Sequence, residues 1–213
     1  LSFSVDQGEF FGFIGPNGAG KSTVMGMLSR LIARDSGLVD FEGTEITRWK
    51  SRELSKQLAI LTQANNVQMK LTVRELVAFG RFPYSGGRLT QEDNEIIDRA
   101  IAYMELGDFE EQFIDELSGG QRQRMEIARV LAQDPTIIIL DEATSALDAK
   151  TEYEVVKSIK DRGITCIVVA HRLSTIRDCD EIIVLDNGVV VERGTHEELY
   201  AKGGFYTQLV TNE

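Results

Sequence analysis

Residues 15–22 combine glycines with a lysine and a serine at a spacing that suits phosphate binding. The run consists of Gly15, Pro16, Asn17, Gly18, Ala19, Gly20, Lys21 and Ser22. Glycines let successive backbone N–H groups turn towards phosphate oxygens, and a helix N-terminus adds positive potential. Lys21 is placed to reach the β- and γ-phosphates, and the Ser22 hydroxyl is placed to bind Mg²⁺. The pattern predicts a P-loop; a glycine turn without function is the alternative.

A pair of carboxylates ends a second promising segment. Ile137–Leu140 is a short apolar run typical of a buried parallel strand, and Asp141 and Glu142 follow it directly. A carboxylate at the end of such a strand lies beside the P-loop in nucleotide-binding folds. Asp141 is therefore a candidate Mg²⁺ ligand, mainly through water, and Glu142 is a candidate for polarising an attacking water. Two ordinary surface acids are the alternative.

The elements around these residues follow an alternating order. Phe10–Ile14 predicts a strand that leads into the P-loop, and apolar residues at helical spacing predict a helix after it. Leu1–Val5 alternates like a further strand, and Asn187-Gly188 predicts a hairpin turn. From about residue 64 to 125 the pattern is mainly helical. Strands alternating with helices indicate an α/β fold with a parallel sheet.

Composition sets limits on the class of protein. The 213 residues are 42% hydrophobic and 27% charged, which is ordinary for a globular domain. The net charge of −11 makes nucleic acid an unlikely primary partner, because the average surface repels phosphate. Two cysteines, Cys166 and Cys179, imply no disulfide framework. No apolar stretch reaches membrane-spanning length, so any membrane role requires another chain or segment.

The segment 117–121, Leu-Ser-Gly-Gly-Gln, adds a further motif. With it, the chain resembles the nucleotide-binding domain of ATP-binding-cassette (ABC) proteins over essentially all of its length. The motifs stand in the order of that family, and they are the P-loop 15–22, Gln63, 117–121, Asp141-Glu142, the Ser-Ala-Leu-Asp run 145–148 and His171. Six ordered motifs make this resemblance specific.

The resemblance implies a fold and a mechanism. The fold is a P-loop NTPase (RecA/F1-like) core over 1–63 and 126–213, a helical subdomain over about 64–125 and a partial antiparallel β-subdomain. The reaction is Mg²⁺-dependent hydrolysis of ATP by a head-to-tail dimer with a second copy or a paralogous ABC domain. Transmembrane subunits of a transporter are the implied partners, with the domain cytoplasmic and peripheral at the inner face of the membrane.

Residue roles follow from the same resemblance. Glu142, His171 and Gln63 are the catalytic set, and Gln63 joins Ser22 and Asp141 at the metal. His171 is expected to contact the γ-phosphate. The nucleotide-binding set comprises residues 15–22 together with Thr23, Ser118, Gly119, Gly120, Gln121 and Asp148. Of these, Ser118, Gly119 and Gly120 are expected to bind the γ-phosphate of the partner domain's nucleotide.

Two departures from the family pattern stand out. The family stacks adenine on an aromatic residue upstream of the P-loop, at a position that falls before Leu1, so a strand carrying this platform is interpreted as missing. The front half, including residues 15–20 and 71–84, resembles iron-siderophore importer ATPases, whereas the back half, including residues 141–148 and 170–176, resembles bacterial peptide or bacteriocin exporters. We hypothesise a recombined or engineered chimera with a junction between about Gly119 and Arg129; a natural, divergent importer-like domain is the alternative.

Three functions remain open on the sequence. The leading interpretation is the ATPase motor of a membrane transporter, with import or export undecided. A second is an ABC ATPase acting on nucleic acid or ribosomes, which usually has coiled-coil inserts, tandem cassettes or basic surfaces. A third is an engineered or recombined P-loop domain that binds nucleotide with little or no turnover. Acceleration of ATP hydrolysis by a membrane partner would favour the transporter motor. Nucleotide binding without turnover would favour the engineered or recombined domain.

Overall fold

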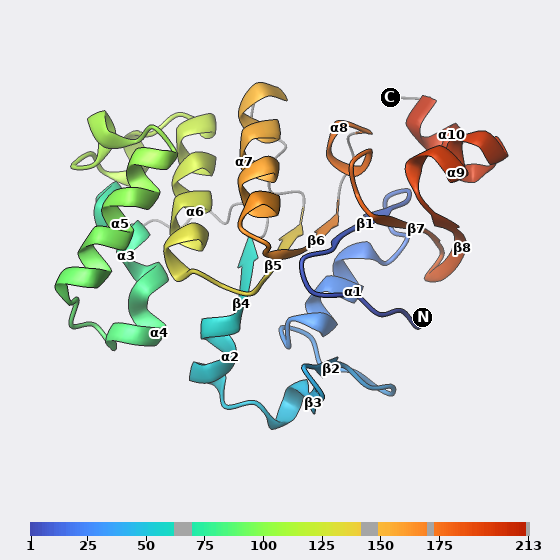
Figure 1. Ribbon diagram of the computed structural model, residues 1–213, viewed down its shortest axis with the longest axis horizontal. Helices are drawn as coiled ribbons and strands as arrows, with labels where there is room; N and C mark the ends of the chain where they lie inside the picture. The colour runs from blue at the N-terminus through green and yellow to red at the C-terminus, as the bar shows by residue number, and fades with distance from the viewer. Residues whose placement is uncertain (62–69, 142–148, 170–172, 212–213) are drawn as a thin grey trace. The chain divides into compact units, whose positions relative to one another are not determined.

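The computed structural model describes residues 1–61, 70–141, 149–169 and 173–211 (Figure 1). The chain forms two compact units. The first contains Leu1–Trp49, the end of strand β5 and the described residues from Ala149 onwards. The second contains the described residues of Lys50–Ile138. It is broader than the predicted helical subdomain, whose boundaries at about 64 and 125 stay a prediction.

The first unit is built on parallel strands. Its elements are β1 (Phe10–Ile14), α1 (Lys21–Leu28), β2 (Asp40–Phe41), β3 (Thr44–Glu45), η1 (Ile46–Arg48), α7 (Ala149–Asp161), β6 (Thr165–Val169), α8 (Leu173–Ile176), β7 (Glu181–Asp186), β8 (Val189–Gly194), α9 (His196–Lys202) and α10 (Phe205–Thr211). β1 pairs in parallel with both β6 and β7. With β5 (Ile137–Asp141) and β4 (Leu58–Leu61), these strands give a six-stranded sheet of order β4-β5-β6-β1-β7-β8. The predicted α/β fold is confirmed.

One sequence signal explains how this sheet ends. β8 pairs antiparallel with β7 through Asn187-Gly188, and both turn residues have positive φ, 46° and 77°. The hairpin predicted from this dipeptide is confirmed. It forms at Asn187-Gly188 because asparagine and glycine tolerate positive φ best. β2 and β3 form a separate antiparallel pair.

The predicted strand at Leu1–Val5 is wrong, since none of its residues has strand structure. The alternation seen in the sequence instead describes burial: Phe3 and Val5 are half-buried and Ser2 and Ser4 are exposed. Phe3 stacks on Phe11 with ring centroids 5.2 Å apart. An extended segment can therefore bury alternate side chains without forming a ladder of backbone hydrogen bonds.

The second unit is mainly helical. Its elements are α2 (Ser51–Gln57), β4, α3 (Val73–Ala78), η2 (Phe79–Arg81), α4 (Phe82–Ser85), α5 (Gln91–Tyr103), η3 (Gly107–Phe109), η4 (Ile114–Glu116) and α6 (Gly119–Gln133), followed by the start of β5. Capping boxes begin α3, α5 and α6, because Thr72, Thr90 and Ser118 each accept a hydrogen bond from the third helical residue. Among the described helices of the chain, none is long and apolar enough to cross a membrane.

Cys166 and Cys179 are both buried in the first unit. Burial raises the pKa of the Cys179 thiol to about 12 and that of Cys166 well above its usual range. Because the thiolate is the reactive form, both side chains should resist iodoacetamide at pH 8 in the native protein and react fully in denaturant. Mass spectrometry of the intact chain counts the adducts; rapid labelling of native protein would contradict the burial.

Candidate functional site

The P-loop connects β1 to α1 within the first unit. All five residues of β1 are buried, which anchors the start of the loop in the sheet. Gly20 is the N-cap of α1 with φ 96°, and Gly18 has φ 82°. Both conformations are ones that residues with a Cβ rarely adopt. Glycine is therefore required here to turn the backbone into the helix.

Lys21 lies inside this loop. It is only 5% exposed, and its Nζ donates hydrogen bonds to the carbonyl oxygens of Gly15 at 2.7 Å and Pro16 at 3.0 Å. The ammonium group is thus held among residues of the loop that was predicted to surround phosphates. A cation there, beside the N-terminus of α1, creates local positive potential in an acidic protein.

Ser22 and Asp141 come together although 119 positions separate them in the sequence. The Ser22 hydroxyl donates to Asp141 Oδ1 at 3.3 Å. Asp141 is the last residue of β5, as the apolar run before it predicted. A hydroxyl and a carboxylate at this distance offer two hard oxygen donors, which fit Mg²⁺. Thr23, the next residue of α1, is exposed.

Ser118 begins α6 in the second unit. Its Oγ accepts from the N–H of Gln121 at 3.3 Å, and the Gln121 side chain accepts from the N–H of Ser118 at 2.9 Å. Ser118 and Gly119 are exposed, and Gly120 is half-buried. We call residues Ser118–Gln121 the signature turn. It presents the N-terminus of a 15-residue helix to solvent, which is an arrangement suited to an anion.

Four predicted site residues lie outside the described part of the chain. They are Gln63, Glu142, Asp148 and His171. Their assigned roles stay predictions.

The structure adds contacts to the P-loop that the sequence did not reveal. The N–H of Gly188, in the β7–β8 hairpin, donates to the carbonyl of Ala19 at 3.0 Å. A Cβ on Gly15 would lie 2.1 Å from the carbonyl oxygen of Leu185 at the end of β7. The sequence marked Gly188 as a turn residue but gave no signal that the turn supports the P-loop.

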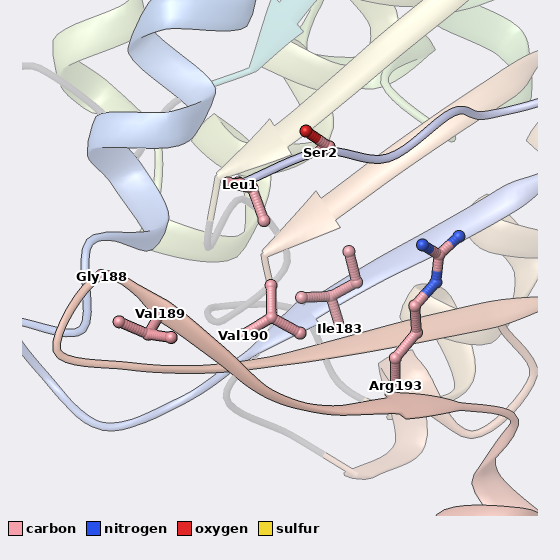
Figure 2. A pocket seen from close by; sticks show the side chains of 7 residues that line it. All are labelled: Leu1, Ser2, Ile183, Gly188, Val189, Val190 and Arg193. Carbon is pink, nitrogen blue, oxygen red and sulfur yellow. The ribbon is translucent and has the colours of Figure 1, made fainter.

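A cavity of about 410 Å³ opens beside the same hairpin (Figure 2). Apolar side chains and one guanidinium form most of its wall, which consists of Leu1, Ser2, Ile183, Gly188, Val189, Val190 and Arg193. The cavity shares Gly188 with the support of the P-loop.

Comparison with known proteins places this geometry in a family. The profile of the family described as ABC transporter matches residues 1–145. The petrobactin import ATP-binding protein YclP of Bacillus subtilis is 45% identical over 203 residues, covering 93% of this chain and 81% of that protein. The petrobactin import ATP-binding protein FatE of Bacillus anthracis is 39% identical, covering 93% of this chain and 82% of FatE.

Proteins of a second kind also match. An ATP-dependent lipid A-core flippase of Alcanivorax borkumensis is 38% identical over 222 residues, covering 98% of this chain and 37% of the flippase. The solved structure of a bacterial Atm1-family ABC exporter with ATP bound superposes with a TM-score of 0.86 at 33% identity, covering 98% of this chain and 38% of the exporter. The chain belongs to the ABC transporter family, as an ATP-binding domain that hydrolyses ATP to drive a transporter.

Proposed function

We propose that the chain powers the import of an iron–siderophore complex. The observation that carries the proposal is the 45% identity to a petrobactin import ATPase across 93% of this chain. Residues 71–84, which contain α3, η2 and all but the last residue of α4, also carry the importer resemblance. The flippase matches favour export as the second candidate, although their identity is lower at 38%.

The P-loop supplies the binding chemistry of the proposed reaction. Lys21 neutralises phosphate charge, while backbone N–H groups of the P-loop, other than at Pro16, hold the phosphate oxygens. Ser22 and Asp141 would hold Mg²⁺, directly and through water. When bound there, the metal would supply charge neutralisation at the β- and γ-phosphates. Glu142, with Gln63 and His171, orients the attacking water.

The signature turn supports a two-domain mechanism. The N-terminus of α6 is exposed at this turn. Ser118, whose hydroxyl forms part of the capping box, is exposed as well. In the proposed head-to-tail dimer this turn binds the γ-phosphate held by the P-loop of the other domain. Each site then needs two chains.

Two exposed aromatic side chains in the second unit support a membrane partner. Phe79 on η2 is 48% exposed, and Phe82 on α4 is 56% exposed. Aromatic side chains at this exposure favour contact with another protein. We infer that the membrane subunits of the transporter dock here, which places the domain against the membrane through its partners.

The hypothesis of a recombined chain gains no support from the comparisons. The import ATPase matches over 93% of the chain and the flippase over 98%, so both kinds of relative match on both sides of the suggested junction. A single natural protein that matches residues 1–118 and 130–213 equally well would exclude the hypothesis.

Steady-state Mg²⁺-ATPase rate against protein concentration tests the proposed dimer. We expect the rate per chain to rise with concentration and then to level off, because each site is completed by a second chain. A rate that is flat and close to background would contradict the dimer and favour binding without turnover.

Import needs a test in cells. The chain should restore growth on ferric petrobactin to a Bacillus subtilis strain that lacks YclP, and the Lys21→Ala variant serves as the matched control. Failure of a well-expressed chain to restore growth would overturn the proposed substrate class. It would leave the conclusion about ATPase activity unchanged.

A further inference from the structure

Arg81 is a buried arginine that joins three segments of the second unit. Its side chain is 7% exposed, and that of Asp93 is 6% exposed. Nε donates to Asp93 Oδ1 at 2.8 Å, and Nη1 donates to the carbonyl of Ala132 at 3.1 Å. The guanidinium also lies 4.0 Å from the centre of the Tyr84 ring. One side chain thus contacts α4, the start of α5 and the last turn of α6. These three helices are labelled in Figure 1.

Asp93 is fixed from its other side by the start of α5. Its Oδ2 accepts from the backbone N–H and from the hydroxyl of Thr90, each at 2.9 Å. The hydrogen bond from the Thr90 backbone, and then the hydrogen bond from Arg81, lower the pKa of Asp93. The carboxylate is therefore charged at neutral pH, and removal of its cation would leave a buried charge uncompensated.

Gly80 brings the backbone of η2 directly against α6. A Cβ at this position would lie 2.3 Å from the carbonyl oxygen of Arg129 and 3.0 Å from the backbone nitrogen of Gln133. The exposed Phe79 and the buried Arg81 flank this glycine. The exposed aromatic side chains and the contact with α6 therefore belong to one short, continuous segment.

α6 connects this contact to the signature turn at one end and to strand β4 at the other. The helix begins at the signature turn and ends at Gln133. The buried Gln133 side chain donates to the carbonyl of Leu58 at 3.0 Å, on the strand that ends two positions before Gln63. A displacement of α6 along its axis would thus move both regions.

We propose that Arg81 is a positioning residue for ATP hydrolysis, which makes Phe79–Ser85, the start of α5 and α6 move as one body. A membrane subunit that docks on Phe79 and Phe82 would then displace the signature turn. The inference rests on the proposed dimer and on the proposed docking surface. A purely structural role of the same ion pair would change stability alone.

The first test is Arg81→Lys, which keeps the charge but loses the planar group that contacts three segments. Arg52→Lys is the matched control, because Arg52 is exposed and donates to the carbonyls of Pro83 and Tyr84 on the same helix α4. In backbone hydrogen exchange we expect Arg81→Lys to accelerate exchange in residues 79–85 and 119–133 together, by about tenfold or more, with α1 unchanged. Wild-type exchange in residues 119–133 would overturn the proposal.

The second test separates positioning from stability in the kinetics. For folded Arg81→Lys we expect kcat at saturating ATP to fall about tenfold, with the Kd for ATP changed less than about twofold, because the P-loop lies in the other unit. Arg52→Lys should leave both values unchanged. If Arg81→Lys fails to fold, Asp93→Asn is the second variant, because it removes the carboxylate of the same ion pair. We expect Asp93→Asn to lower kcat as well.

The outcomes are distinct from failure of the proposed function. A lower melting temperature with unchanged kcat would show that the ion pair is structural and would overturn the proposal. If the wild-type rate does not rise with concentration, the proposed dimer is wrong, and the exchange experiment alone decides whether Arg81 couples its segments to α6.

Discussion

Replacing Lys21 by alanine should abolish measurable nucleotide binding. The ammonium group is buried within the loop that is proposed to hold the phosphates, and it is bonded to the carbonyls of Gly15 and Pro16. Without the ammonium group, the negative phosphates would face carbonyl oxygens, which repel them, in a protein whose net charge is −11. We expect ATP affinity to fall by about a hundredfold or more, since hydrogen bonds to charged groups and their Coulomb attraction are both lost.

Isothermal calorimetry with Mg²⁺-ATP measures this effect. Lys157→Ala is the control, because Lys157 is an exposed lysine on α7 in the same unit. Its affinity should match that of the unaltered protein. Circular dichroism establishes that both variants are folded. If Lys21→Ala binds ATP with unchanged affinity, residues 15–22 are not the nucleotide site.

Glu142→Gln should stop hydrolysis and leave ATP binding intact. The amide keeps the size of the side chain but cannot act as a base, and general-base catalysis contributes about 10²–10⁴ in rate. We therefore expect kcat to fall by about a hundredfold or more. Because ATP is then not consumed, the proposed dimer should persist with nucleotide bound.

Gel filtration with and without Mg²⁺-ATP detects that dimer, and a phosphate-release assay gives the rate. Glu197→Gln, an exposed glutamate on α9, is the control and should retain normal turnover. Equal monomer content in the presence and absence of ATP would count against the trapped dimer. Normal hydrolysis by Glu142→Gln would remove the residue from the catalytic set.

Local signals in the sequence predicted much of the fold. The apolar run before Asp141 correctly indicated a buried strand, and Asn187-Gly188 correctly indicated a hairpin. Such signals depend on neighbours within about four positions, so a single sequence reveals them. The approach of Ser22 to Asp141 followed from the topology of parallel strands, whose ends meet at one edge of the sheet.

Contacts between distant segments could not be predicted in the same way. The pairing of Arg81 with Asp93 and Ala132 depends on how several helices pack, and a buried arginine has no signature of its own in the sequence. The support that Gly188 gives to Ala19 likewise depends on the register of β7 with β8. At Leu1–Val5 the alternation was correct and the strand was wrong, because half-burial does not require a neighbouring strand.

The contact of the β7–β8 hairpin with the P-loop has a consequence for engineering. Leu185 leaves room only for a glycine at position 15, and Gly188 holds the Ala19 carbonyl. The loop is thus preorganised during folding, so that nucleotide need not bear the entropic cost of shaping it. Grafting residues 15–22 onto another strand and helix would transfer the motif without this brace. Such a graft should bind ATP weakly until the hairpin is transplanted with it.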